Sequence, residues 1–231
     1  MDTEFEDCIA TAEAVAFAGE SLAPFFLNDP RTGDAQAVFA AMALIDPQAA
    51  ASEWPFASEE EARRAFGLMV EGLRPCMGGC ADGDAAPSAF HADDALTDEY
   101  RRLFIGPAPK PAPPWGSVYT DRECVVFGES TIALRAWMRE NGIVRLSDER
   151  TPEDHIGLML ALMAYVARMY TGLLDEYLRL HFLTWAPHFL GEFADAAQHP
   201  FYRGLALLTD STLAGIRDAL GVEVVEPRFY R

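Results

Sequence analysis

Residues 151–167, TPEDHIGLMLALMAYVA, say more about the fold than any other stretch of the sequence. Thr151 can cap a helix, with Pro152 at its first position and Asp154 in its first turn, where an acid meets the positive end of the helix dipole. The apolar run at 156–167 is too short to span a bilayer. We therefore expect this stretch to form a buried helix of the protein core.

The same helical period recurs on both sides of that stretch. Ser58 and Glu61 have the spacing of a capping box at the start of a helix. Apolar residues then follow at helical spacing on one face: Ala62, Ala65, Phe66, Met69, Val70 and Leu73. Further helices are expected from Ser130 to about Asn141, and from Pro200 onward.

Strand-like patterns are scarce. Only residues 123–127 and 222–225 look extended, and strands do not alternate with helices as they do in α/β proteins. The sequence therefore predicts an all-α fold, a single globular helical domain of about ten helices. Two segments, residues 78–88 and 142–151, are candidate flexible connections, and neither is long enough to separate independent domains.

The charge of the chain excludes several partners. The 231 residues carry a net charge of −18, and residues 1–62 hold thirteen acids and one base. Such a chain repels nucleic acid and anionic membranes, whereas it suits a cationic partner or simply keeps the protein in solution. The N-terminus is acidic where a signal peptide is basic, so a cytoplasmic protein is expected. The four cysteines lack paired metal-ligand spacing and are expected to be free thiols.

Motifs for enzyme chemistry are missing from the sequence. No Gly-rich loop precedes a lysine, since the single lysine, Lys110, lies among prolines. No GxSxG or HExxH motif occurs, and Pro187 interrupts the helix that would align His181 with His188. We therefore expect no metal site and no cofactor, whereas a hydrolase that uses Asp154 and His155 with an activated water stays an alternative.

Two features remain as functional candidates. Asp154 beside His155 could tune a general base, but the same residues also make a good helix start. Residues 103–123, LFIGPAPKPAPPWGSVYTDRE, carry five prolines together with Trp115 and Tyr119. This stiff loop suits the docking of an apolar peptide, or it crosses the core with Trp115 buried. The residues alone leave both alternatives open.

A longer pattern resembles a known family. Residues 100–142, YRRLFIGPAPKPAPPWGSVYTDRECVVFGESTIALRAWMRENG, followed by PEDH at 152–155, resemble the redox enzyme maturation proteins, in particular the branch that serves dimethyl sulfoxide reductase. The resemblance is dense over 100–167 and continues through HFLTW at 181–185 and HPFYR at 199–203. Residues 1–95 match the family only in helical character.

The resemblance implies a function. These proteins are cytoplasmic chaperones, not enzymes, that bind the twin-arginine leader of a molybdoenzyme catalytic subunit and hold it back from Tat export until its cofactor is inserted. The implied leader-binding residues are Tyr100, Leu103, Phe104, Trp115, Tyr119, Gly128, Pro152, Asp154 and His155. The alternative is a scaffold that binds the folded client or the cofactor-insertion machinery. Contacts with Tat or insertion machinery are further expected partners.

The family also implies a division of the chain. A variable N-terminal half, about 1–145, is joined through a hinge at about 142–151 to a more constant C-terminal half, about 152–231. A monomer is the default expectation, and such a hinge permits a domain-swapped dimer. Many relatives have Glu before the Pro of the P-x-D-H motif, where this chain has Thr151. Another acid, Glu153 or Asp154, would then contact the leader's arginines, and His155 would add sensitivity to pH near neutrality.

Overall fold

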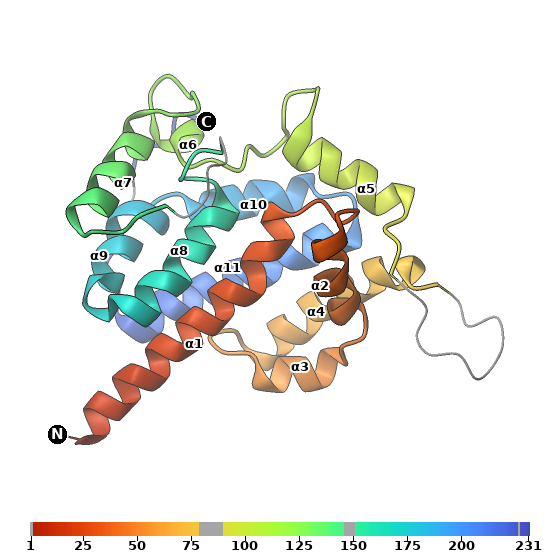
Figure 1. Cartoon of the computed structure of the whole chain (residues 1–231), viewed down its shortest axis with the longest axis horizontal. Helices are drawn as coiled ribbons and strands as arrows, with labels where there is room; N and C mark the ends of the chain where they lie inside the picture. Colours follow the sequence, from red (N-terminus) through yellow and green to blue (C-terminus); the bar gives the residue numbers. More distant parts are fainter. Residues whose placement is uncertain (1, 79–89, 146–150, 226) are drawn as a thin grey trace. The chain divides into compact units, whose positions relative to one another are not determined.

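The computed structural model describes residues 2–78, 90–145, 151–225 and 227–231. Eleven α-helices account for most of these residues: α1 (Asp2–Leu27), α2 (Gly33–Ala43), α3 (Pro47–Glu53), α4 (Glu59–Leu73), α5 (Asp94–Tyr100), α6 (Ser117–Thr120), α7 (Glu129–Glu140), α8 (Ile156–Met169), α9 (Leu174–Tyr177), α10 (Ala186–Ala196) and α11 (Pro200–Leu220). Short 3₁₀ or π turns extend or precede some of them: η1 (Arg74–Cys76), η2 (Arg101–Ile105), η3 (Thr171–Leu173) and η4 (Leu178–Phe182). The predicted all-α fold is confirmed (Figure 1).

The contacts group the chain into two compact units. Unit 1 comprises Met1–Ala23, Pro113–Phe189 and Ile216–Arg231, and unit 2 comprises Pro24–Ala112 and Leu190–Gly215. The helices α1, α10 and α11 supply residues to both units within this single helical domain. The expected hinge stays a prediction, because residues 146–150 lie outside the described part of the chain, as do residues 79–89 of the other candidate connection.

Unit 1 is built on the helix that the sequence singles out. The apolar side chains of α8 at Leu160 and Met163 are fully buried. A second apolar cluster comes from the aromatic residues of α9, η4 and the turn before α10, in which Tyr177, Phe182 and Trp185 follow one another in ring contact. Burying these large side chains is the main stabilising contribution to this unit, at about 1.5–3 kcal/mol for each apolar side chain.

Unit 2 has a core of phenylalanines. Phe39 contacts the rings of both Phe25 and Phe201 at centroid distances of 5.1 and 5.2 Å. The capping box predicted at the start of α4 is present, with Ser58 and Glu61 bonding to each other's backbone N–H. All six apolar residues predicted on one face of α4 are buried. Local sequence signals and packing therefore agree in this part of the fold.

Two expectations about local structure were wrong. Helix α8 begins at Ile156 with His155 as its N-cap, rather than at Thr151 and Pro152. The reason is tertiary, because Asp154 and His155 pair with residues 114–116 in an extended bridge, so the helix begins only after them. Residues 123–127 and 222–225 are not strands, and the only pairings among the described residues are two isolated bridges.

Two further findings concern composition-based expectations. Among residues 2–78, 90–145, 151–225 and 227–231, no helix has the length and apolar character needed to cross a membrane. Cys8, Cys76 and Cys124 are free thiols, as expected, whereas Cys80 lies outside the described residues.

Candidate functional site

Two distant segments of unit 1 meet at the Asp154-His155 turn. The Gly116 N–H donates to the carbonyl of Asp154 at 3.1 Å, and the Ile156 N–H donates to the carbonyl of Pro114 at 2.9 Å. The rings of Trp115 and His155 lie edge to face, with centroids 5.9 Å apart. The proline-rich loop and the P-x-D-H motif, which the sequence presents separately, are therefore one structural feature.

Asp154 anchors this junction with one carboxylate oxygen. Its Oδ2 accepts a hydrogen bond from the Ser117 N–H at the start of α6, at 2.8 Å. The side chain is almost fully buried, and Oδ1 makes no hydrogen bond of good geometry with the described residues. Burial raises the pKa of Asp154, although Ser117 and the nearby Thr131 hydroxyl partly oppose the shift. A buried carboxylate with an open acceptor favours a cationic donor.

His155 has a local structural role. Its Nδ1 accepts a hydrogen bond from the Gly157 N–H, which satisfies one of the free donors at the start of α8. The imidazole is buried, and this burial lowers its pKa from 6.5 to about 3. The ring is therefore neutral throughout the neutral pH range. This opposes the expectation that His155 makes the site sensitive to pH.

A cavity of about 270 Å³ adjoins Asp154. Its lining comes from the α6 region, α7 and the segment before α10: Gly116, Thr120, Ser130, Ala133, Leu134, Asp154, Leu180, His181, Thr184 and Trp185. Burial lowers the pKa of His181 to about 4, so this ring is neutral at pH 7. The lining thus has hydroxyl groups and one acid but no cation. We call this space the Asp154 cavity.

The residue before Asp154 has the opposite surroundings. Glu153 accepts a hydrogen bond from Arg135 Nε at 2.6 Å and another from Arg145 at 3.2 Å. Burial raises the pKa of Glu153, but the two guanidinium groups outweigh it and hold the pKa below its usual value. Glu153 is therefore a paired, ionised carboxylate.

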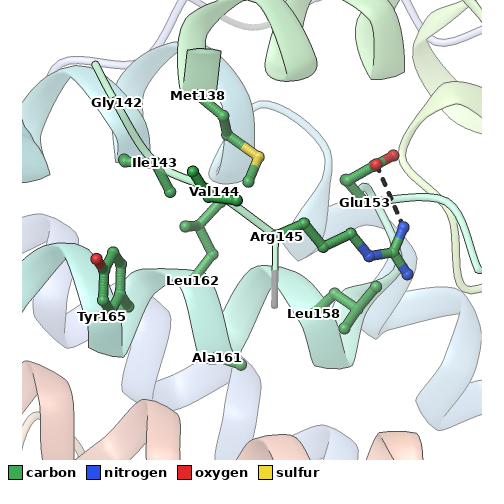
Figure 2. A pocket seen from close by; sticks show the side chains of 10 residues that line it. All are labelled: Met138, Gly142, Ile143, Val144, Arg145, Glu153, Leu158, Ala161, Leu162 and Tyr165. Carbon is green, nitrogen blue, oxygen red and sulfur yellow. Dashed lines mark hydrogen bonds and ion pairs between the residues drawn. The ribbon is translucent and has the colours of Figure 1, made fainter. Parts of the chain in front are cut away.

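Glu153 and Arg145 form the polar end of an apolar pocket of about 330 Å³ between α7 and α8 (Figure 2). The remaining lining is almost entirely apolar: Met138, Gly142, Ile143, Val144, Leu158, Ala161, Leu162 and Tyr165. Figure 2 shows Val144 and Leu162 near the middle of this group and Tyr165 at the end away from Glu153. We call this space the α7–α8 pocket.

Sequence reasoning did not single out the apolar lining of this pocket. A signal was present, because Leu158, Leu162 and Tyr165 recur at helical spacing on α8, beside the buried face that carries Met159 and Met163. A helix that carries apolar side chains outside its core face presents an apolar surface to which a peptide or another protein can bind.

Three other predicted site residues lie in the same unit. Pro152 is buried in the turn before Asp154. Tyr119 is fully buried, with its ring stacked near Trp185 at a centroid distance of 6.3 Å. Gly128 is required by a close approach, since a Cβ there would lie within 1.6 Å of the Asp121 carboxylate that faces the start of α7. Of the three, Tyr119 packs against Trp185, which lines the Asp154 cavity.

The last three predicted residues lie in unit 2. Tyr100 and Phe104 are in ring contact at 5.1 Å, and Leu103 is fully buried. Their side chains are part of the core of that unit, next to Phe193. The structure thus brings Trp115, Asp154 and His155 together in one unit, and Tyr100, Leu103 and Phe104 in the other.

Comparison with known proteins gives a consistent result. A family model described as nitrate reductase delta subunit matches residues 60–191, more than half of the chain. The chain is 49% identical over 136 residues to a protein named "Probable Tat proofreading chaperone DmsD" from Haemophilus influenzae, covering 59% of this chain and 67% of that protein. It is 46% identical over 149 residues to the "Tat proofreading chaperone DmsD" of Salmonella typhi, covering 63% and 72%.

One solved structure is also similar. A putative redox enzyme maturation protein from Archaeoglobus fulgidus aligns over 91% of this chain and 93% of its own, with a TM-score of 0.44 and 17% identity, an overlap from which nothing about the fold follows. The family match and the curated relatives confirm the resemblance predicted from residues 100–167, and the chain belongs to the nitrate reductase delta subunit family.

Proposed function

We propose that this protein is a cytoplasmic chaperone that binds the twin-arginine leader of a molybdoenzyme catalytic subunit, of the dimethyl sulfoxide reductase type, before Tat export. The observation that carries the proposal is its 49% identity to a Tat proofreading chaperone over 67% of that protein. The protein assists maturation by holding the leader, and no turnover is expected. The acid-rich chain, at a net charge of −18, attracts a leader whose conserved feature is a pair of arginines.

The Asp154 cavity supports the recognition of an arginine. Oδ2 of Asp154 accepts from the Ser117 N–H, the Ser117 and Thr131 hydroxyls lie close enough to lower its pKa, and no ion pair joins it to the described residues. A guanidinium group there would stabilise a buried negative charge, with a charge-assisted hydrogen bond worth about 1.5–3 kcal/mol. His181 on the cavity wall is neutral at pH 7 and does not compete for the carboxylate. Asp154 thus takes the role that an acid at position 151 would have in other family members.

The α7–α8 pocket supports the recognition of the apolar stretch that follows the arginines. The pocket has room for two or three apolar side chains and is lined by residues such as Leu158, Leu162 and Tyr165. Because Glu153 and Asp154 are adjacent, an extended peptide can reach the cavity and the pocket together. Trp115, packed against His155 and partly exposed, lies at the same turn. The six predicted residues of unit 1 line or support this surface. The three predicted residues of unit 2, Tyr100, Leu103 and Phe104, would contribute by stabilising the core of that unit.

Calorimetric titration with a synthetic twin-arginine leader tests the proposal. We expect saturable binding of the leader, with Arg-Arg→Lys-Lys weaker and Arg-Arg→Ala-Ala weaker still, because lysine keeps the charge but loses the bidentate geometry. Equal binding of all three peptides would contradict arginine recognition. Binding of a leader-deleted client as tight as that of the full client would instead support the scaffold function.

A further inference from the structure

The segment 227–231, PRFYR, is attached to the site through α6. The Tyr230 N–H donates to the carbonyl of Tyr119 at 3.0 Å, near the end of that short helix. The ring of Phe229 stacks on His188 with centroids 4.1 Å apart and planes within 11°. Figure 1 shows the end marked C beside α6. A main-chain hydrogen bond together with a side chain laid on a ring is the way in which an extended peptide docks on a protein.

The segment has the chemistry of the proposed leader. It contains two arginines, Arg228 and Arg231, around the two aromatic side chains of Phe229 and Tyr230. A twin-arginine leader likewise combines guanidinium groups with an apolar stretch. The carbonyl that holds the segment belongs to Tyr119, one of the predicted leader-binding residues.

Much of the segment is exposed. Arg228 and Tyr230 are exposed, and the Arg228 guanidinium lies over the ring of Tyr230, 5.4 Å from its centroid, rather than reaching into the protein. Val225, just before the segment, is 84% exposed. A short terminal segment with exposed side chains and an exposed approach opens at a low free-energy cost. Its release would uncover the Tyr119 carbonyl and the face of His188.

We propose that residues 227–231 are an internal competitor of the leader. They occupy a peptide-docking surface made of the Tyr119 carbonyl and the His188 ring, and the leader displaces them when it binds. This inference rests on the proposed function, because the competing ligand is the leader. The apparent affinity for the leader is then lowered by the fraction of molecules in which the segment is docked.

Removal of the segment gives the first test. In a variant that stops after Val225, we expect the leader to bind about five- to tenfold more tightly than to the full chain in calorimetric titration. A segment that only supports the end of α6 predicts the opposite, weaker binding together with a lower melting temperature. An unchanged or weakened affinity overturns the inference.

Point variants separate the Tyr230 main-chain hydrogen bond and the Phe229 ring contact from general effects. Tyr230→Pro removes the N–H donor to Tyr119, whereas Tyr230→Ala keeps it, so only the proline variant should tighten leader binding as the truncation does. Phe229→Ala should also tighten binding, while the matched control Val225→Ala, at an exposed position, should not. Equal affinities for Tyr230→Pro and Tyr230→Ala would contradict the role of the main-chain hydrogen bond.

Hydrogen exchange provides a direct readout of displacement. With saturating leader, the amide of Tyr230 should exchange faster than in the free protein, because its bond to Tyr119 is broken. An unchanged or slower exchange, with the leader bound, overturns the inference alone and leaves the proposed function intact. If the leader binds neither the full chain nor the truncated variant, the proposed function fails, and the inference falls with it.

Discussion

Glu153 and Asp154 are neighbours in the chain but belong to two different regions of unit 1. Glu153 forms the polar end of the apolar α7–α8 pocket and is bonded to Arg135 and Arg145, which hold its pKa below the usual value. Asp154 lines the polar cavity, where burial raises its pKa and no cation of the described residues pairs with it. Two adjacent acids thus have opposite electrostatic surroundings.

This difference shows which acid is available to a partner. A leader arginine at Glu153 would have to compete with two guanidinium groups that the chain already supplies. At Asp154 it would meet a buried carboxyl group that has hydrogen bonds but no ion pair with the described residues. The pocket beside Glu153 instead offers apolar surface. The comparison therefore assigns charge recognition to one region and apolar recognition to the other, and four experiments can break or sharpen this assignment.

The largest expected effect is on stability at acidic pH. The pKa of His155 is 6.5 in the unfolded chain and about 3 in the fold, so below pH 6.5 the unfolded state binds more protons and stability falls as the pH falls. Between pH 7 and pH 5 this costs about 2 kcal/mol, and His181, whose pKa is lowered to about 4, adds a similar amount. Asp154, with its raised pKa, acts in the opposite direction.

Urea unfolding of the wild type and of His155→Gln at both pH values measures this effect. The loss between pH 7 and pH 5 should be about 2 kcal/mol smaller in the variant, because its residue 155 does not titrate. The same loss in both proteins would mean that His155 is solvated, and that the Asp154 turn is more open than its burial indicates.

The second effect compares the two acids directly. Asp154→Asn can keep an acceptor for the Ser117 N–H but removes the negative charge, so the affinity for a twin-arginine leader should fall by about 1.5–3 kcal/mol, roughly 10- to 100-fold. Glu153→Gln should change this affinity by less than about threefold, since its charge is already paired. Calorimetric titration of both variants decides the matter, and a larger loss in Glu153→Gln would reverse the assignment.

The third effect concerns the apolar region. Leu162→Ser places a hydroxyl in the α7–α8 pocket and should weaken leader binding by about 1 kcal/mol, roughly fivefold, through lost apolar contact. Met169→Ser on the same helix is the matched control, because Met169 is 62% exposed and lies outside the pocket lining. Equal effects of the two substitutions would argue that the apolar stretch of the leader binds elsewhere.

The sequence predicted the parts of the fold that local signals control. The capping box at Ser58 and the single apolar face of α4 were visible in a few residues, and the structure has both. The start of α8 was misplaced because a hydrogen bond between Ile156 and Pro114, 42 residues earlier, overrides the local capping signals. The pairing of Glu153 with Arg135 is likewise invisible in the sequence, since it depends on where α7 packs.

The smallest expected effect is that of pH on leader binding. The affinity for the leader should be nearly constant between pH 6 and pH 8. His155 and His181, with pKa values of about 3 and 4, stay neutral across this range. A bound guanidinium group also lowers the pKa of Asp154 and keeps it ionised. Calorimetry at pH 6, 7 and 8 should therefore give dissociation constants within about twofold of each other.

If binding instead weakens toward pH 6, the titrating group is Asp154, and the pH dependence should vanish in Asp154→Asn. A dependence that persists in that variant would place arginine recognition outside the Asp154 cavity.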